Sequence, residues 1–174
     1  MHKRIAKFHK VSLERFSKDW RDTFGDGISD EEIQKIYEEI PLPKRATAGS
    51  AGYDFYMPET FVIAPGETLK IPTGIRVEME REWVLKCYPR SGLGFKYRLQ
   101  LNNTVGIIDS DYFYSDNEGH IFMKMKNCGD KPVVIESGDG FCQGIFVTYG
   151  ITEDDKVEIS RNGGIGSTDK KGNN

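Results

Sequence analysis

The sequence is poor in the residues from which proteins build disulfide frameworks and zinc sites. Its 174 residues include three cysteines and three histidines, and neither set has the spacing of metal ligands. The odd number of cysteines also argues against a disulfide framework. We therefore predict that Cys87, Cys128 and Cys142 are thiols of the core, in a reduced, cytoplasmic setting.

An excess of basic charge and a long hydrophobic run are also missing. The 24 Lys and Arg residues are balanced by 27 Asp and Glu residues, with a formal net charge of −3, so no nucleic-acid partner is predicted. A polyanionic ligand would have to be held by local arginines and backbone N–H groups. No apolar segment follows the charged first seven residues, so we expect neither a signal peptide nor a membrane partner.

What is present indicates one folded, turn-rich domain over residues 1–174, with 37% apolar residues and 19 glycines. Residues 1–40 predict a helical N-terminal extension of two short helices, packed on the core or on a neighbouring subunit. Ser29 and Glu32 have the spacing of a capping box for the second helix. The first helix has one apolar face, formed by Leu13, Phe16, Trp20 and Phe24.

Residues 41–160 predict an all-β core. Short runs rich in Val, Ile, Phe and Tyr alternate with Gly and Pro turn signals every 8–12 residues or so, as in a sandwich, jelly roll or barrel. Period-two alternation is visible in residues 68–71, 75–79, 83–87 and 121–126. Residues 161–174 are polar and glycine-rich, which predicts a flexible C-terminal tail.

The stretch from residue 102 to 112 places a carboxylate directly after a β-type apolar run. Two isoleucines precede Asp109, at a position where a carboxylate can be partly desolvated and act as a general base. Tyr112 offers a flat face for a planar or sugar-like ligand. The alternative is a β-turn in which Asp109 and Asp111 bond the backbone, and the stretch alone leaves both interpretations open.

Four further polar, glycine-bearing segments interrupt the strand-like sequence. They are residues 50–54, 89–94, 138–143 and 161–168. Within the second segment, Arg90, Ser91 and Gly92 offer a guanidinium, a hydroxyl and an unhindered N–H, which are suitable donors for a phosphate chain. A purely structural turn is the alternative for this segment, and a frayed terminus is the alternative for the last one.

Taken together, in this order and at these separations, the five segments resemble the five motifs of the trimeric dUTPase family. The strings Pro-Arg-Ser-Gly-Leu-Gly (89–94) and Gly-Ile-Ile-Asp-Ser-Asp-Tyr (106–112) are specific, and the likeness covers about residues 44–168. The resemblance implies a distorted jelly roll of the β-clip type. It also implies a homotrimer with shared active sites that hydrolyses dUTP to dUMP and pyrophosphate.

The resemblance assigns a role to each residue of the carboxylate stretch. It implies that Asp109 deprotonates the water that attacks the α-phosphorus and also bonds the sugar 3′-hydroxyl. Tyr112 would lie beneath the deoxyribose and leave no room for a 2′-hydroxyl. Asn103 would help to read uracil, together with the backbone of a hairpin that includes Gly106 and Ile108.

On the phosphate side, the resemblance implies that Ser91 donates to the α–β bridging region while Gly92 contributes its N–H. Arg90 and Asp54 would hold each other, and Gln143 would bond the α-phosphate and the attacking water. Mg²⁺ would be held by the triphosphate and waters, without a direct protein ligand. The tail residues expected to close over the nucleotide are Arg161, Ile165, Gly166, Ser167 and Thr168.

The sequence departs from the family pattern at three places. Ile165 stands where the family usually has an aromatic ring that stacks on uracil. Residues 113–120 intervene where the family makes a tight turn after the tyrosine. Gly140 replaces a usual arginine, which would remove one structural ion pair. We hypothesise that Phe113 or Tyr114 supplies the missing ring.

Two other functions are compatible with this type of fold. The sister enzyme dCTP deaminase places its general-base glutamate three residues before an asparagine, where this sequence has Lys124 before Asn127. Its hairpin typically reads Ile-Asp-Pro-Gly, where this chain has Ile-Asp-Ser-Asp at 108–111. The second alternative is a non-catalytic homologue that binds nucleotides or a protein partner as a regulator.

Overall fold

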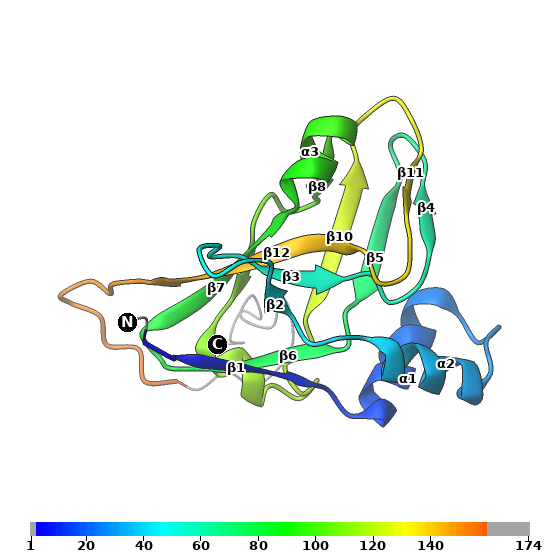
Figure 1. Ribbon diagram of the computed structural model, residues 1–174. Helices are drawn as coiled ribbons and strands as arrows, with labels where there is room; N and C mark the ends of the chain where they lie inside the picture. Colours follow the sequence, from blue (N-terminus) through cyan, green and yellow to red (C-terminus); the bar gives the residue numbers. More distant parts are fainter. Residues whose placement is uncertain (1–2, 160–174) are drawn as a thin grey trace, which may run out of the picture.

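Figure 1 shows the computed structural model of the protein, which describes residues 3–159. The predicted tail lies outside this range. The expected site residues that fall within that tail are Arg161, Ile165, Gly166, Ser167 and Thr168.

The strands of the described chain form four antiparallel sheets. The largest sheet has the order β2 (Lys44–Arg45), β3 (Tyr53–Tyr56), β12 (Gly140–Thr148), β7 (Trp83–Pro89) and β9 (Gly106–Ile108). A second sheet has the order β5 (Thr68–Pro72), β10 (Phe122–Asn127) and β8 (Leu99–Leu101). The two-stranded sheets pair β1 (Ala6–Lys10) with β6 (Ile75–Met79) and β4 (Phe61–Ile63) with β11 (Val133–Ile135).

The core lies between these sheets because the strands alternate apolar and polar residues. Along β10, Met123 and Met125 are buried whereas Lys124 and Lys126 are exposed, as the two-residue period of a strand requires. The side chains of the large sheet that meet them in the core include Phe55, Leu85 and Phe141, each almost fully buried. The predicted all-β fold is confirmed, with helices as minor additions.

Two helices, α1 (Leu13–Phe24) and α2 (Asp30–Glu39), lie together at one end of the molecule (Figure 1). The predicted capping box is present, because Ser29 and Glu32 each bond the other's backbone N–H. Gly25 ends α1 with φ +87°, a conformation that glycine adopts without strain. Phe16 and Ile33 are fully buried, so the helices share the core of the β structure.

The sequence interpretation missed β1, which lies inside the region expected to be a helical extension. Phe8 of β1 pairs with Val77 of β6, so this segment belongs to the β fold. The helices are therefore inserted between β1 and β2 instead of preceding the fold. The signal for β1 was weak because lysines and a histidine surround Phe8 in the sequence.

The connection between β8 and β9 also differs from expectation. β8 pairs with β10 whereas β9 pairs with β7, so the two strands belong to different sheets and do not form the predicted hairpin. Gly106 permits the close approach of β9 to β7, since a Cβ built there would lie 3.2 Å from the Cβ of Cys87. Within residues 3–159, no helix is long and apolar enough to cross a membrane.

Candidate active site

A group of polar side chains gathers where β7 ends. In the register of the large sheet, Gln143 of β12 lies opposite Asp54 on one side and Tyr88 on the other. Arg90 follows β7 directly and precedes α3 (Ser91–Tyr97). The sheet therefore brings together residues from the polar segments 50–54, 89–94 and 138–143.

Arg90 and Asp54 form the predicted ion pair, with the Arg90 Nε and the Asp54 Oδ1 separated by 3.4 Å. The Asp54 side chain is 14% exposed and the Arg90 side chain is 44% exposed, so the guanidinium can still face a ligand. Gly140 makes room for it, because a Cβ at this position would lie 2.7 Å from the Arg90 Nη1. The absence of a side chain at Gly140 thus accommodates Arg90.

Gln143 is held between the strand end and the first polar segment. Its Nε2 donates to the Pro89 carbonyl at 3.4 Å, and a Cβ at Gly52 would lie 2.5 Å from its Oε1. Gly52 is therefore required for the observed position of the amide. Burial, reinforced by the Asp54 carboxylate, raises the pKa of the nearby Tyr56 hydroxyl.

The predicted Arg-Ser-Gly turn is the beginning of helix α3. Ser91 and Gly92 are exposed in its first turn, where backbone N–H groups have no partner within the helix. A cleft of about 430 Å³ opens beside them. Its charged lining residues, Arg90, Lys96 and Asp139, give it a net positive charge. The sequence interpretation had not assigned a role to Lys96 or Asp139, although Asp139 lies within the polar segment 138–143.

Asp109 lies at a different strand end. It follows β9, is partly buried, and caps the short 3₁₀ helix η1 (Ser110–Tyr114), in which the Tyr112 N–H donates to the Asp109 carbonyl at 3.1 Å. Tyr112 is 3% exposed. Its hydroxyl donates to the His120 carbonyl at 2.7 Å and accepts from the Asn117 Nδ2 at 2.9 Å.

The cluster of Asp54, Arg90 and Gln143 lies far from Asp109 within one chain. β9 runs antiparallel to β7 with Ile108 opposite Leu85, so Asp109 follows on beside Val84. Arg90 lies beyond the other end of β7, roughly 20 Å from Val84 at about 3.3 Å per residue. The fold therefore brings Asp54, Arg90 and Gln143 together but separates them from Asp109.

The residues predicted to contact the nucleobase lie in β9 and in the connection before it. Asn103 is exposed, and its carbonyl accepts from the Val105 N–H at 2.8 Å. Gly106 is partly exposed and Ile108 is buried, with the intervening Ile107 52% exposed. An exposed amide thus precedes a strand whose side chains alternate between core and surface.

The two rings proposed to replace the tail aromatic differ in their surroundings. The Arg76 guanidinium lies 3.7 Å from the centre of the Phe113 ring, and it also donates to the Phe113 carbonyl at 2.7 Å. One face of Phe113 is therefore already covered. Tyr114 is 72% exposed, which leaves it the more accessible of the two.

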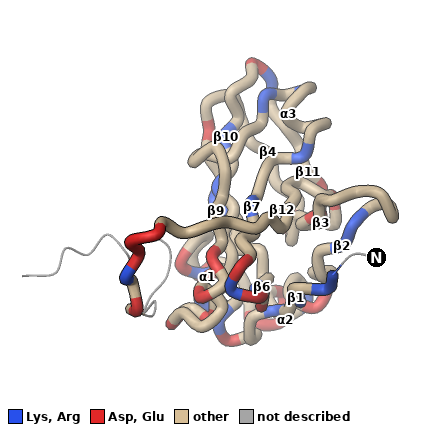
Figure 2. The backbone as a smooth tube through the Cα atoms, turned by 90° about the vertical axis from the view of Figure 1, so that its left-hand side faces the viewer, with Lys and Arg blue, Asp and Glu red and all other residues tan. Residues whose placement is uncertain are grey.

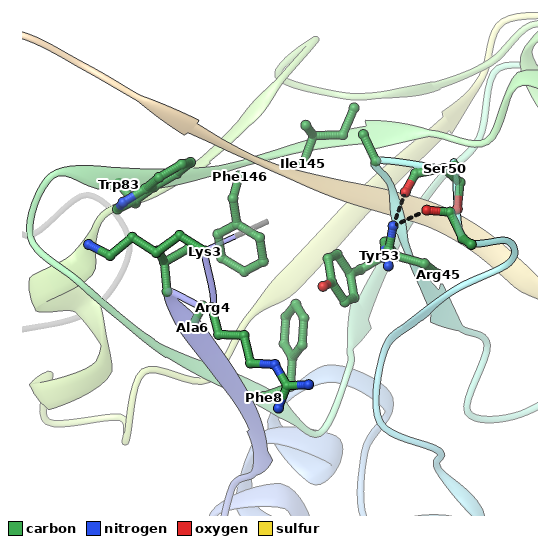
Figure 3. A pocket seen from close by; sticks show the side chains of 14 residues that line it. Lys3, Arg4, Ala6, Phe8, Arg45, Ser50, Tyr53, Trp83, Ile145 and Phe146 are labelled. Atoms are coloured by element: carbon green, nitrogen blue, oxygen red, sulfur yellow. Dashed lines mark hydrogen bonds between the residues drawn. The ribbon is translucent and has the colours of Figure 1, made fainter. Parts of the chain in front are cut away.

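A second cavity, of about 570 Å³, lies between β1, the loop after β2 and β12 (Figure 3). The rings of Phe8, Tyr53 and Phe146 line it, and the Arg45 guanidinium donates to the Ala48 and Ser50 carbonyls at 2.8 and 2.9 Å. These bonds hold the first polar segment in place. Sequence reasoning did not predict this cavity.

Neither cavity carries the ligand set of a metal ion. In the part of the chain that the structure describes, no three His, Cys, Asp or Glu side chains gather as metal ligands. Lys and Arg residues are interspersed with Asp and Glu along the described backbone (Figure 2). A mainly antiparallel β fold with a positively charged cleft and a strand-end carboxylate is suited to an enzyme that acts on a phosphorylated small molecule.

Comparison with known proteins specifies this class. The model of the dUTPase family matches residues 38–169. The deoxyuridine 5′-triphosphate nucleotidohydrolase of Lactococcus lactis subsp. lactis is 46% identical over 132 residues, which are 74% of this chain and 88% of the relative. The crystal structure of dUTPase from Streptococcus mutans aligns with a TM-score of 0.60 at 42% identity, over 67% of this chain and 91% of that one.

A dUTPase from Staphylococcus aureus phage phi11, whose structure details the coordination of a structural Mg(II) ion, aligns with a TM-score of 0.58. The identity is 24%, over 70% of this chain and 92% of the phage protein, and this likeness supports the fold alone. The chain belongs to the dUTPase family. It is a dUTP diphosphatase, an enzyme of nucleotide metabolism that hydrolyses dUTP.

Proposed function

We propose that the chain hydrolyses dUTP to dUMP and pyrophosphate by attack of water on the α-phosphorus, with Asp109 as the general base. As the water oxygen bonds to phosphorus, its proton passes to the Asp109 carboxylate and the bond to the α–β bridging oxygen breaks. The leaving oxygen keeps the electron pair as pyrophosphate departs. The partly buried position of Asp109 at a strand end supports this role.

The phosphate chain would bind at the positively charged cleft beside α3. Ser91 donates to the α–β bridging region, and the Gly92 N–H bonds a phosphate oxygen. Gln143 bonds the α-phosphate and orients the attacking water. Arg90, held by Asp54, supplies positive charge where negative charge accumulates in the transition state.

The observation that carries the proposal is the separation between this cleft and Asp109. Two groups about 20 Å apart in one chain cannot both contact the α-phosphorus of the same nucleotide. They can do so when Asp109 of one chain faces the cleft of another. The enzyme is therefore proposed to be a homotrimer whose sites combine residues of different chains.

The nucleoside would lie against the Asp109 segment. Asn103 and the backbone around Gly106 and Ile108 read uracil, because cytosine presents the opposite donors and acceptors and would leave buried groups unpaired at about 1–3 kcal/mol each. Tyr112 lies beneath the deoxyribose and excludes a 2′-hydroxyl. The exposed ring of Tyr114 is the better candidate for stacking on the base.

Mg²⁺ is proposed to bind the triphosphate oxygens and waters, where it would neutralise phosphate charge. The cleft fits a metal carried in by the substrate, since its charged lining is Arg90, Lys96 and one carboxylate, Asp139. Residues 161–168 are proposed to close over the bound nucleotide, with Arg161, Gly166, Ser167 and Thr168 near the β- and γ-phosphates. Ile165 would cover the uracil.

Identification of products tests the proposal against its two alternatives. With Mg²⁺ present, dUTP should yield dUMP and pyrophosphate, while dCTP should remain unchanged. Conversion of dCTP to dUTP would instead identify a deaminase, and turnover of neither nucleotide would identify a regulatory homologue. The deaminase is disfavoured because Lys124, at the position of its general-base glutamate, is a lysine exposed on β10. Asn127, three residues later, is buried, and its Nδ2 donates to the Ile63 and Lys131 carbonyls.

A further inference from the structure

The helical insertion and the loop after Tyr112 contact each other in the fold. Helix α1 and residues 115–120 are separated by about a hundred positions in the sequence, and both lie outside the five motif segments. Asp19 of α1 reaches His120 at the end of the loop. The helical insertion, most of which precedes the residues matched by the family model, and the loop that departs from the family pattern therefore form one structural unit.

His120 is the centre of this unit and is fully buried. The Gly74 N–H donates to its Nε2 at 2.8 Å, so this nitrogen is the unprotonated acceptor of a neutral imidazole. The proton is then on Nδ1, which lies 2.6 Å from the Asp19 Oδ2 and donates to it. Asp19 is itself 8% exposed and fixes both the tautomer and the orientation of the ring.

The same loop holds Tyr112 by its hydroxyl. This hydroxyl donates to the carbonyl of His120 and accepts from the Asn117 side chain. Gly119 lies directly on the backbone of η1, since a Cβ there would be 2.7 Å from the Tyr112 carbonyl oxygen. A shift of His120 would therefore be transmitted to the Tyr112 ring.

A second set of contacts fastens the outer part of the loop to the start of α1. The Ser12 N–H and hydroxyl donate to the two Glu118 carboxylate oxygens at 2.8 and 2.6 Å. Arg15 donates to the Asp116 carbonyl at 3.0 Å. The loop is thus held by α1 at both its middle and its end.

We infer that the helical insertion braces Tyr112, and that Asp19 and His120 are positioning residues that set the discrimination between dUTP and UTP. Asp19 orients His120, and the His120 carbonyl fixes the Tyr112 hydroxyl. This inference rests on the proposed role of Tyr112 in excluding the 2′-hydroxyl. A loosened ring leaves room for ribose, so UTP gains relative to dUTP.

The test measures kcat/KM for dUTP divided by kcat/KM for UTP, a ratio that does not depend on the fraction of folded enzyme. In the full-length protein, Asp19→Ala should lower this ratio about tenfold, in line with the loss of one charge-assisted hydrogen bond. Asp19→Asn keeps an acceptor for the His120 Nδ1–H and should retain a ratio near that of the wild type.

The matched control is Arg21→Ala on the same helix. Arg21 binds Asp30 at 2.7 Å and so joins α1 to α2 without touching the loop. The Arg21→Ala substitution should weaken the contact between α1 and α2 and leave the dUTP-to-UTP ratio of kcat/KM unchanged. Glu118→Asn provides a milder variant, because asparagine tolerates the positive φ of this position but is too short to keep the Ser12 contacts; it should also lower the ratio.

Equal losses of activity toward dUTP and UTP in both Asp19→Ala and Glu118→Asn would overturn the inference, because they would show a purely structural role. Tyr112→Ala separates this failure from a failure of the proposed function. If Tyr112→Ala leaves the ratio unchanged, Tyr112 does not exclude ribose, and both its proposed role and the inference that rests on it fall. If Tyr112→Ala lowers the ratio while Asp19→Ala and Glu118→Asn do not, only the inference that the helical insertion positions Tyr112 is refuted.

Discussion

At the scale of single residues, the charged side chains of the site have two different roles. One pair orients a guanidinium toward the cleft, and one carboxylate is proposed to accept a proton. Arg90 and Asp54 form a partly exposed ion pair, and such a pair contributes only about 0–1 kcal/mol to stability. Its value is orientation, because it fixes the guanidinium beside Gly140 at the edge of the cleft. Asp109 instead lies partly buried at the end of the apolar strand β9, a position where a general base can meet a water molecule.

Replacement of the base is the most direct test at this scale. Asp109→Asn should lower kcat about 10²–10⁴-fold, the usual contribution of a general base, because the amide cannot accept the proton of the water. The KM and the affinity for dUTP should change little, since size and shape are kept. Pyrophosphate release and calorimetric titration measure the two quantities. Asp116→Asn, in the exposed loop nearby, serves as the control, and near-normal turnover of Asp109→Asn would refute the assignment.

His120 should make stability depend on pH. Burial lowers its pKa below the ordinary value of about 6.5, while the bond to Asp19 and the charges of Asp19 and Glu118 oppose this shift and Arg15 supports it. Because the folded pKa is below the unfolded one, its contribution is complete above about pH 6.5 and is lost as pH falls toward the folded pKa.

The expected loss is at most about 1.4 kcal/mol per pH unit for one proton. Urea unfolding at constant protein concentration, between pH 7.5 and 5.5, measures it. The variant His120→Asn should lose less stability over this range than the wild type does. Equal pH dependence of the two proteins would show that another group titrates.

At the scale of elements, β7 organises the site through its two ends. One end leads to Arg90 and α3, and the other lies beside Asp109 at the end of β9. β12 pairs with β7 in regular register, whereas its pairing with β3 shifts between Gly140 and Cys142. On β12, Gly140 lies against Arg90, and the Gln143 Nε2 donates to the Pro89 carbonyl.

The contact between β12 and Arg90 can be tested by filling the space at Gly140. Gly140→Val should displace the guanidinium from Asp54 and lower kcat/KM for dUTP about tenfold, the equivalent of about 1.4 kcal/mol. Thermal unfolding should change little, since Arg90 is at the surface. Gly150→Ala is the matched control because a Cβ there meets no atom within 4 Å. Unchanged activity of Gly140→Val would show that the guanidinium position is unimportant.

Buried thiols of the same sheet give a further prediction. Burial raises the pKa of Cys87 to about 12 and also raises that of Cys142, so both remain as unreactive thiols. Only Cys128, which is partly exposed, should react with iodoacetamide in the native protein at pH 8. Mass spectrometry should count at most one adduct before denaturation and three after it. Rapid labelling of Cys87 or Cys142 would contradict the packing of β7 against β12.

At the scale of the whole molecule, activity should require assembly. We expect a particle with three times the chain mass of 19.8 kDa in analytical ultracentrifugation. Asp109→Asn and Ser91→Ala trimers should each be nearly inactive, yet activity should return after their subunits are exchanged. Hybrid trimers contain some sites that combine an intact Asp109 with an intact Ser91. If hybrids form without any recovery of activity, the sites are not shared.

The local features of this protein could be predicted from its sequence alone. Alternating residues predicted β5, β6, β7 and β10, Ser29 and Glu32 predicted a helix start, and five short motifs identified the family and paired Arg90 with Asp54. Such signals are local because side-chain period, capping and motif chemistry are contained within a few residues.

How these features meet depends on the tertiary fold. It assigned β8 and β9 to different sheets, placed β1 beside β6, and separated Asp109 from Arg90 along β7. It also joined Asp19 to His120 across the core. These contacts depend on strand register and on packing between residues far apart in the chain, and no local pattern specifies them.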